Sequence, residues 1–101
     1  MTSQGHAQAR LSRALARGDL LAARAAAGEL PAVNLSDAAA MVVLIRALEP
    51  ARFERAAVRW VGRLALERQG VALDDLRLAV AALRRLPDDD ALAALKRLGQ
   101  R

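Results

Sequence analysis

The sequence contains no cysteine and no tyrosine, and its aromatic residues are Phe53 and Trp60. Without cysteine the chain forms no disulfide, no thiolate zinc site and no thiol nucleophile. The single histidine, His6, lies near the N-terminus, where we expect the helix to fray. No serine has a general base close to it in the sequence, and no glycine-rich phosphate loop is present. These absences predict a protein that is not an enzyme and that requires no cofactor.

Long apolar stretches are also lacking. The longest strongly apolar run covers eight residues, 38–45, whereas a transmembrane helix needs about 20. The first ten residues, MTSQGHAQAR, are polar, so we expect no secretory signal among them. We therefore predict a cytoplasmic protein without a membrane partner.

Lysine occurs only once, as Lys96, whereas alanine, leucine and arginine are abundant. This composition is typical of GC-rich bacterial genomes, so part of the net charge of +5 reflects codon usage. A basic surface attracts nucleic acids and acidic proteins alike. The charge therefore limits the class of partner without identifying it.

The chain of 101 residues is long enough for one domain, and its commonest residues favour helices. Glycine and proline mark the breaks between helices, and the predicted N-caps are Asp19, Ser36 and Asp74. We expect six helices, at residues 6–17, 19–28, 36–49, 50–69, 74–86 and 88–99. The sequence thus predicts an all-α fold, a compact bundle of five to six helices in a single domain over residues 1–101, with residues 1–5 flexible.

A weak internal repeat occurs at an offset of 38 residues. Residues 33–48, VNLSDAAAMVVLIRAL, align with residues 71–86, VALDDLRLAVAALRRL, and six aligned positions are identical. The repeat indicates two helix–loop–helix units, which arose either by duplication or because two similar loops converged. Two units are too few for a solenoid, which needs about three.

The predicted third helix is apolar on all sides, so we expect it at the centre of the bundle. The fifth carries a narrower apolar stripe at helical spacing. The side chains that we expect to be largely buried are Leu44, Ile45, Phe53, Trp60, Leu64, Val80 and Leu83.

The stretch RFERAAVRWVGRL, residues 52–64, carries four arginines on one side of a predicted helix. At 100° per residue they fall within about 80° of one another, and Trp60 lies where this basic sector meets the apolar one. Glu54 and Arg68 fall in or beside the apolar sector, so we expect them to be paired or to reach toward solvent. The predicted partner-binding residues are Arg52, Arg55, Arg59 and Arg63, which we call the arginine ridge, together with Trp60.

Two interpretations of the arginine ridge stay open. In the first, the arginines dock another protein or the phosphates of a nucleic acid, and Trp60 anchors or stacks on the partner. In the second, the arginines form a solvated helix face and Trp60 belongs mainly to the core. Repulsion between like charges on a helix costs only a few tenths of a kcal/mol per pair, so a solvated ridge is tolerated without a function.

A second basic stripe, formed by Arg10, Arg13 and Arg17, follows the first predicted helix, with Arg24 beyond it. The sequence does not decide whether this stripe and the arginine ridge form one patch. The stretch LALERQGVALDDLRLAV has the outline of a helix-turn-helix. However, Leu66 stands where such motifs usually hold a small residue, so this motif is the weaker interpretation.

Five aspartates cluster at two predicted helix starts. Carboxylate oxygens bind hard cations, but the spacing does not match an EF-hand loop. Aspartate at a helix start accepts hydrogen bonds from free backbone N–H groups and interacts favourably with the helix dipole. We therefore expect helix capping, and no metal, from Asp74, Asp75, Asp88, Asp89 and Asp90.

Residues 29–83, and within them FERAAVRW and GVALDD, resemble small alanine- and arginine-rich all-helical proteins of unknown function from GC-rich bacteria. The resemblance covers about half of the chain and implies a helical architecture. It implies no activity and transfers no site residue. The sequence as a whole predicts an interaction module that docks an acidic or helical protein, with nucleic-acid binding as the alternative and the oligomeric state, including a homo-oligomer, left open.

Overall fold

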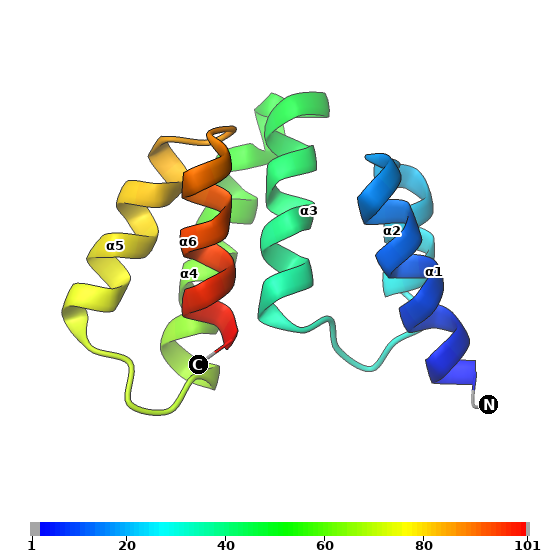
Figure 1. The fold of residues 1–101 in the computed structure, drawn as a ribbon, viewed down its shortest axis with the longest axis horizontal. Helices are drawn as coiled ribbons and strands as arrows, with labels where there is room; N and C mark the ends of the chain where they lie inside the picture. Colours follow the sequence, from blue (N-terminus) through cyan, green and yellow to red (C-terminus); the bar gives the residue numbers. More distant parts are fainter. Residues whose placement is uncertain (1–2, 101) are drawn as a thin grey trace.

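The structure, a computed structural model, describes residues 3–100, which form six α-helices and a short 3-10 helix (Figure 1). The predicted all-α bundle of five to six helices is confirmed. The first helix begins at Ser3, earlier than expected, and residues 1–2 of the segment expected to be flexible lie outside the described residues. The elements are α1 (Ser3–Arg17), α2 (Leu20–Ala27), α3 (Leu35–Leu48), η1 (Pro50–Arg52), α4 (Phe53–Glu67), α5 (Leu73–Arg84) and α6 (Asp89–Gln100).

Gly18 and Asp19 separate α1 from α2 as predicted. Gly18 has a φ of +71°, a left-handed conformation that glycine adopts without steric cost at the end of a helix. The Asp19 carboxylate accepts a hydrogen bond from the Ala22 backbone N–H at 3.0 Å. The chain therefore reverses within two residues, and α1 and α2 form a hairpin.

The N-cap prediction for α3 is wrong by two residues. Asn34, rather than Ser36, accepts a hydrogen bond from the Asp37 backbone N–H at 2.8 Å. The helix therefore begins at Leu35, whose side chain is buried in the core.

The N-cap prediction for α5 is also wrong. The helix begins at Leu73, and the Ala72 backbone N–H donates to the Asp75 carboxylate at 3.0 Å. Asp75 thus caps the helix from its third position. Asp74 is exposed and lies 3.6 Å from Arg77.

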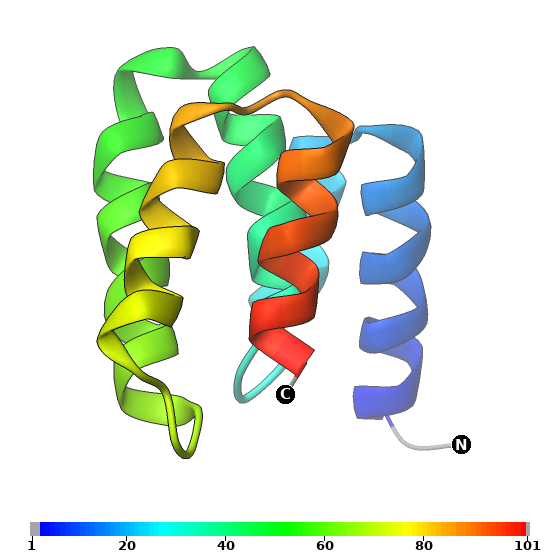
Figure 2. The same cartoon turned by 60° about the vertical axis from the view of Figure 1, so that its left-hand side comes forward.

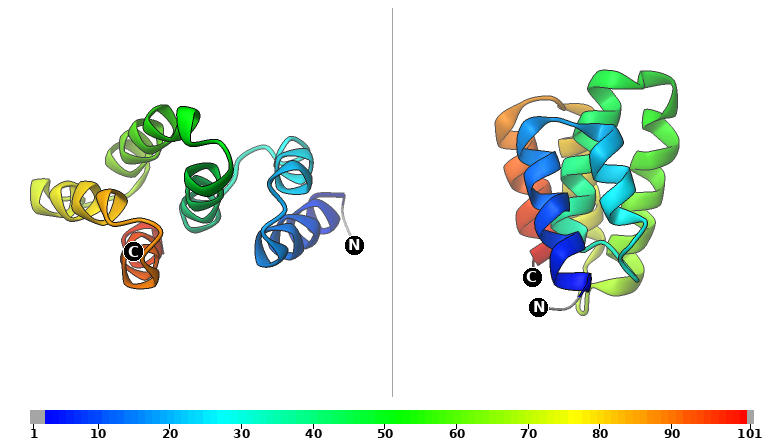
Figure 3. Two further views of the ribbon diagram at one scale, coloured as in Figure 1. Left: turned by 90° about the horizontal axis from the view of Figure 1, so that it is seen from above. Right: turned by 90° about the vertical axis from the view of Figure 1, so that its right-hand side faces the viewer.

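Helices α3, α4, α5 and α6 close into a four-helix bundle, because α3 and α5 each contact both α4 and α6. The α1–α2 hairpin packs against α3 from outside this bundle (Figures 1 and 2). The predicted central position of α3 is confirmed. Seen from above, α2 and α4 stand on one side of α3, whereas α1 and α6 stand on the other (Figure 3).

The core prediction is confirmed for Trp60, Leu64 and Leu83, which are buried. It is wrong for Val80, which is 38% exposed. Leu44, Ile45 and Phe53 are only half-buried. Ile45 lies in a groove between α2 and α4, and Leu44 lies in a second groove between α1 and α6. The two grooves on either side of α3 therefore explain why this central helix is not fully enclosed.

The two copies of the internal repeat occupy different environments. Leu35 and Val42 in α3 are buried, whereas their counterparts Leu73 and Val80 in α5 are exposed. Helix α3 has neighbours on both sides and α5 lies at the margin of the molecule (Figure 3). The matching residues therefore do not mark equivalent positions in the core.

Within residues 3–100, no helix combines the length and the apolar composition that crossing a membrane requires. The cytoplasmic location stays a prediction.

Candidate functional site

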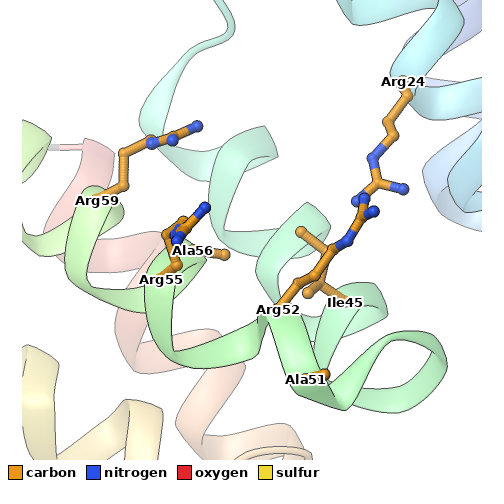
Figure 4. A pocket seen from close by; sticks show the side chains of 7 residues that line it. All are labelled: Arg24, Ile45, Ala51, Arg52, Arg55, Ala56 and Arg59. Carbon is orange, nitrogen blue, oxygen red and sulfur yellow. The ribbon is translucent and has the colours of Figure 1, made fainter.

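Three arginines of the predicted ridge line a groove of about 480 Å³ between α2 and α4. Helix α2 contributes Arg24 to the opposite wall, and α3 contributes Ile45 to the lining. In the close view, the guanidinium groups extend from both walls into the space between the helices (Figure 4). We call this feature the basic groove; its lining residues are Arg24, Ile45, Ala51, Arg52, Arg55, Ala56 and Arg59.

The Arg24 guanidinium forms a fork with the carboxylate of Glu49 at the edge of the basic groove. Its two terminal nitrogens donate to the two carboxylate oxygens at 2.8 and 2.7 Å. The Arg52 guanidinium lies 3.7 Å from the same carboxylate. This fork joins α2 to the end of α3.

The remaining arginines of the groove are not neutralised. Arg55 and Arg59 are exposed and make no ion pair with any carboxylate in residues 3–100. The Arg52 side chain is 71% exposed and makes only the distant contact with Glu49. Because Glu49 compensates only one of the four arginines, the groove carries a positive potential that attracts anions.

Arg63, the fourth residue of the predicted ridge, does not line the groove. Its side chain is only 26% exposed and pairs with Glu67 at 2.6 Å. It also donates to the backbone carbonyl of Val33 at 2.6 Å, in the loop that leads into α3. Arg63 therefore braces this loop against α4, and its role is structural.

The prediction that Trp60 anchors a partner is wrong. The residue is 2% exposed, and its indole N–H donates to the Leu35 carbonyl at 2.8 Å. Trp60 lies at the edge of the predicted apolar sector, but α3 packs over this edge of α4 and covers the ring. Its position on one helix did not reveal this, because the covering helix comes from elsewhere in the chain.

The second basic stripe is separate from the groove except at its end. Arg17 lines a hollow next to the groove, together with Arg24 and Glu49. Arg10 pairs with Glu29 at 2.7 Å, and neither Arg10 nor Arg13 lines the basic groove. The two predicted arginine stripes therefore do not merge into one continuous patch.

Two exposed leucines lie beside the arginines. Leu21 of α2 is 81% exposed and Leu48 of α3 is 58% exposed. Both line the hollow of about 620 Å³ that shares Arg24 with the basic groove. An apolar contact surface therefore adjoins the basic one, across the Arg24–Glu49 fork.

The ion pairs of the hairpin and groove shift the pKa values of their carboxyl groups. The hydrogen bonds from Arg24 lower the pKa of Glu49 below its ordinary value of 4.5, and Arg52 lowers it further. Arg10 lowers the pKa of Glu29 in the same way. Arginine hydrogen bonds to a carboxylate stabilise its charged form, so both glutamates are ionised at neutral pH.

Two of the five aspartates predicted to cap helices, Asp75 and Asp88, accept hydrogen bonds from the backbone. Asp75 accepts from the Ala72 N–H at 3.0 Å and Asp88 accepts from the Asp90 N–H at 3.1 Å. In the part of the chain that the structure describes, no three His, Asp or Glu side chains are grouped so that they could hold a metal ion. His6 is exposed on α1.

Glu49 and the contribution of Arg24 to the groove were missed by the sequence analysis. Arg24 precedes Arg52 by 28 positions, so helical periodicity cannot relate them. The only local signal is that Glu49 stands directly before Pro50 at a helix end. The groove exists because the hairpin places α2 opposite α4.

No family model matches the chain, and neither does any curated protein or any solved structure. The resemblance to alanine- and arginine-rich bacterial proteins stays a prediction. Any function must therefore be argued from the groove itself.

Proposed function

We propose that the protein is a non-enzymatic docking module that binds an acidic partner protein in the basic groove. One observation carries this proposal: four arginines from α2, η1 and α4 line a single groove, and one carboxylate, that of Glu49, stands at its edge. Like charges on facing walls repel one another, and an anionic partner relieves this repulsion.

The preference for a protein follows from the mixed character of the surface. The Arg24–Glu49 fork is the bidentate geometry by which arginine recognises carboxylates. Ile45 and the adjacent Leu21 and Leu48 offer apolar contacts that the side chains of a protein can use. Charge then speeds association, and apolar contacts supply affinity that salt does not screen.

Nucleic acid is the competing partner, because arginine also binds phosphate. Single-stranded nucleic acids are usually held by base stacking on exposed aromatic rings. Trp60 is buried here, and Phe53 is half-buried with the Arg46 guanidinium 5.4 Å from its ring centre. The groove thus offers phosphate contacts without a stacking surface.

Fluorescence anisotropy can distinguish the two partners. The probes are a labelled acidic peptide of glutamate and leucine and a labelled DNA duplex with the same number of negative charges, each titrated at two salt concentrations. We expect the acidic peptide to bind more tightly than DNA at the higher salt, because salt does not screen the contacts of its leucines. Phosphate binding by several arginines weakens steeply with salt because counterions return to the DNA.

The double substitution Arg55→Gln with Arg59→Gln should weaken binding of the acidic peptide several-fold. The matched control is Arg13→Gln with Arg97→Gln, which removes the same charge from exposed positions outside the groove. An equal loss of binding affinity in the two double variants would show that binding depends on net charge alone. Tighter binding of DNA at both salt concentrations would make nucleic acid the partner and overturn the proposal.

A further inference from the structure

The arrangement of charge and apolar surface indicates what form the partner takes. Resting on the proposed function, we infer that the bound segment is an acidic amphipathic α-helix of the partner. It presents two carboxylates one turn apart to Arg55 and Arg59, and an apolar side chain to Leu21 and Leu48. Three features of the described residues support this occupant.

The first feature is the lining of the groove. Its walls are helices whose backbone groups are already hydrogen-bonded within the helix, and its side chains are arginines and apolar groups. Arginine donates but does not accept hydrogen bonds. The N–H groups of an extended peptide would lose water there without finding an acceptor, at a cost for each buried group. A helix satisfies its own backbone and avoids this cost.

The second feature is the spacing of the uncompensated arginines. Arg55 and Arg59 are four residues apart on α4, which corresponds to about 6 Å along the helix axis. Carboxylates four residues apart on a partner helix have the same separation and lie on one face. Each can therefore meet one guanidinium without distortion of either helix.

The third feature is the apolar pair at one end of the surface. Leu21 and Leu48 are among the large apolar side chains that stay exposed in residues 3–100, and they lie beyond the Arg24–Glu49 fork. An apolar residue of the partner would remove them from water. Helices that bind in grooves typically combine such apolar anchors with flanking charges.

Three labelled peptides of about 15 residues test this inference. An isolated helix of this length is marginal in water. The first is covalently stapled as a helix and carries two glutamates four residues apart with a leucine on the same face. The second has the same composition and staple, but its glutamates are two residues apart and point to opposite faces. The third has the sequence of the first with a central proline that prevents the helix.

We expect the first peptide to bind at least about tenfold more tightly than the other two, a difference of about 1.4 kcal/mol. Substituting Arg55→Gln with Arg59→Gln should remove this advantage, and Arg13→Gln with Arg97→Gln should preserve it. Replacing Leu21 and Leu48 by serine should weaken binding of the first peptide, because this peptide carries its leucine on the same helical face as its glutamates.

Equal binding of the first and third peptides would overturn the helical occupant and leave the acidic partner of the proposed function standing. If none of the peptides binds but the DNA duplex does, both the inference and the proposed function fail. Circular dichroism of each variant verifies that the substitutions leave the fold intact.

Discussion

The environment of each arginine depends on its angle from the buried face of its helix. On α4, Trp60 and Leu64 mark the buried face. Arg63 lies nearest to that face on the helical wheel and becomes a half-buried brace, whereas Arg55 lies farther round and stays exposed. The arginines of the ridge therefore divide into one with a structural role, Arg63, and others that stay exposed.

Arg63→Gln should destabilise the protein, because it removes the hydrogen bond to the Val33 carbonyl and the ion pair with Glu67. We expect a loss of about 1–2 kcal/mol in the free energy of unfolding, measured by urea denaturation. Arg55→Gln is the matched control and should change stability by less than about 0.5 kcal/mol. Equal effects of the two substitutions would contradict the structural role of Arg63.

Arg68 follows the last residue of α4, in the connection to α5, and its side chain is largely buried. Its side chain is 7% exposed and lies 3.2 Å from the Asp75 carboxylate, which is 16% exposed. Of the two alternatives that the sequence left open for Arg68, pairing and reaching toward solvent, the structure shows pairing. Two of its nitrogens, Nε and Nη1, are buried without a hydrogen-bond partner, so the guanidinium depends heavily on Asp75.

Asp75→Asn should therefore cost about 3 kcal/mol in unfolding free energy, because it leaves a buried charge without its counterion. The double substitution Arg68→Met with Asp75→Asn removes that charge and should recover a large part of the loss. Urea denaturation of the two variants measures the difference. A double variant that is less stable than Asp75→Asn alone would show that Arg68 contributes favourably without its partner.

At the scale of elements, two glycines show how closely the helices approach. A Cβ added at Gly99 of α6 would lie 2.9 Å from the Cβ of Leu35 in α3, whereas a Cβ at Gly62 of α4 would meet nothing within 4 Å. Helices α3 and α6 therefore touch at a position where only glycine fits. Gly62 has no such neighbour.

Gly62→Ala should stabilise the protein by about 0.5–1 kcal/mol, because alanine favours the helix over the unfolded chain. Gly99→Ala gains the same propensity but must push α6 away from α3, and should cost about 1–3 kcal/mol overall. Thermal unfolding of the two variants gives opposite shifts in Tm. A Tm for Gly99→Ala at or above that of the wild type would mean that α6 moves freely on α3.

Three ion pairs make stability dependent on pH: Arg10–Glu29 and Arg24–Glu49 join distant parts of the chain, and Arg63–Glu67 lies within α4. Glu29, Glu49 and Glu67 each have a pKa below the ordinary value of 4.5, chiefly through arginine hydrogen bonds. A carboxyl group whose folded pKa is lowered stabilises the fold above its unfolded pKa. This contribution disappears as the pH falls through the folded value.

We therefore expect the unfolding free energy to decline as the pH falls below about 4.5. Arg24→Gln with Glu49→Gln should make this decline shallower, since it removes the fork between α2 and α3. Urea denaturation from about pH 6 to pH 3 measures both profiles. If the unfolding free energy falls with pH at the same slope in the wild type and the double variant, the fork does not stabilise the fold.

At the scale of the whole molecule, residues 3–100 form two hydrophobic clusters that bury unequal amounts of apolar side chain. The cluster of α3–α6 contains Trp60, Leu64, Leu83 and Leu95, whereas the buried residues of the hairpin cluster are Leu11 and three alanines. Alanine removes little apolar area from water. The hairpin therefore depends more on its polar contacts with the bundle, such as Gln8 with Asp37 at 2.8 Å.

Native-state hydrogen exchange should reveal this inequality. We expect the amides of α1 and α2 to exchange through local opening at a lower free energy than the core amides of α3 and α4. Arg24→Gln should lower the protection of α2 further and leave that of α4 unchanged. Equal protection of the hairpin and the bundle would mean that the molecule opens as one cooperative unit.

The sequence by itself determined the number of helices, their approximate ends and the central position of α3. These features depend on local chemistry: glycine at Gly18, Asp19 as an N-cap, and apolar residues on all sides of one helix. It also predicted that Arg52, Arg55 and Arg59 lie together, and all three line the groove, although Arg52 belongs to η1 and not to α4. These conclusions need only local sequence signals and the periodicity of a helix.

Only the tertiary structure decided what faces each helix. It buried Trp60 under α3, exposed Val80 at the margin, turned Arg63 into a brace and placed Arg24 across from Arg55. Burial and charge pairing depend on which elements meet, and contacts between residues far apart in the chain leave no periodic signal. The basic groove arises in this way, because folding brings together walls from α2 and α4, which are distant in the sequence.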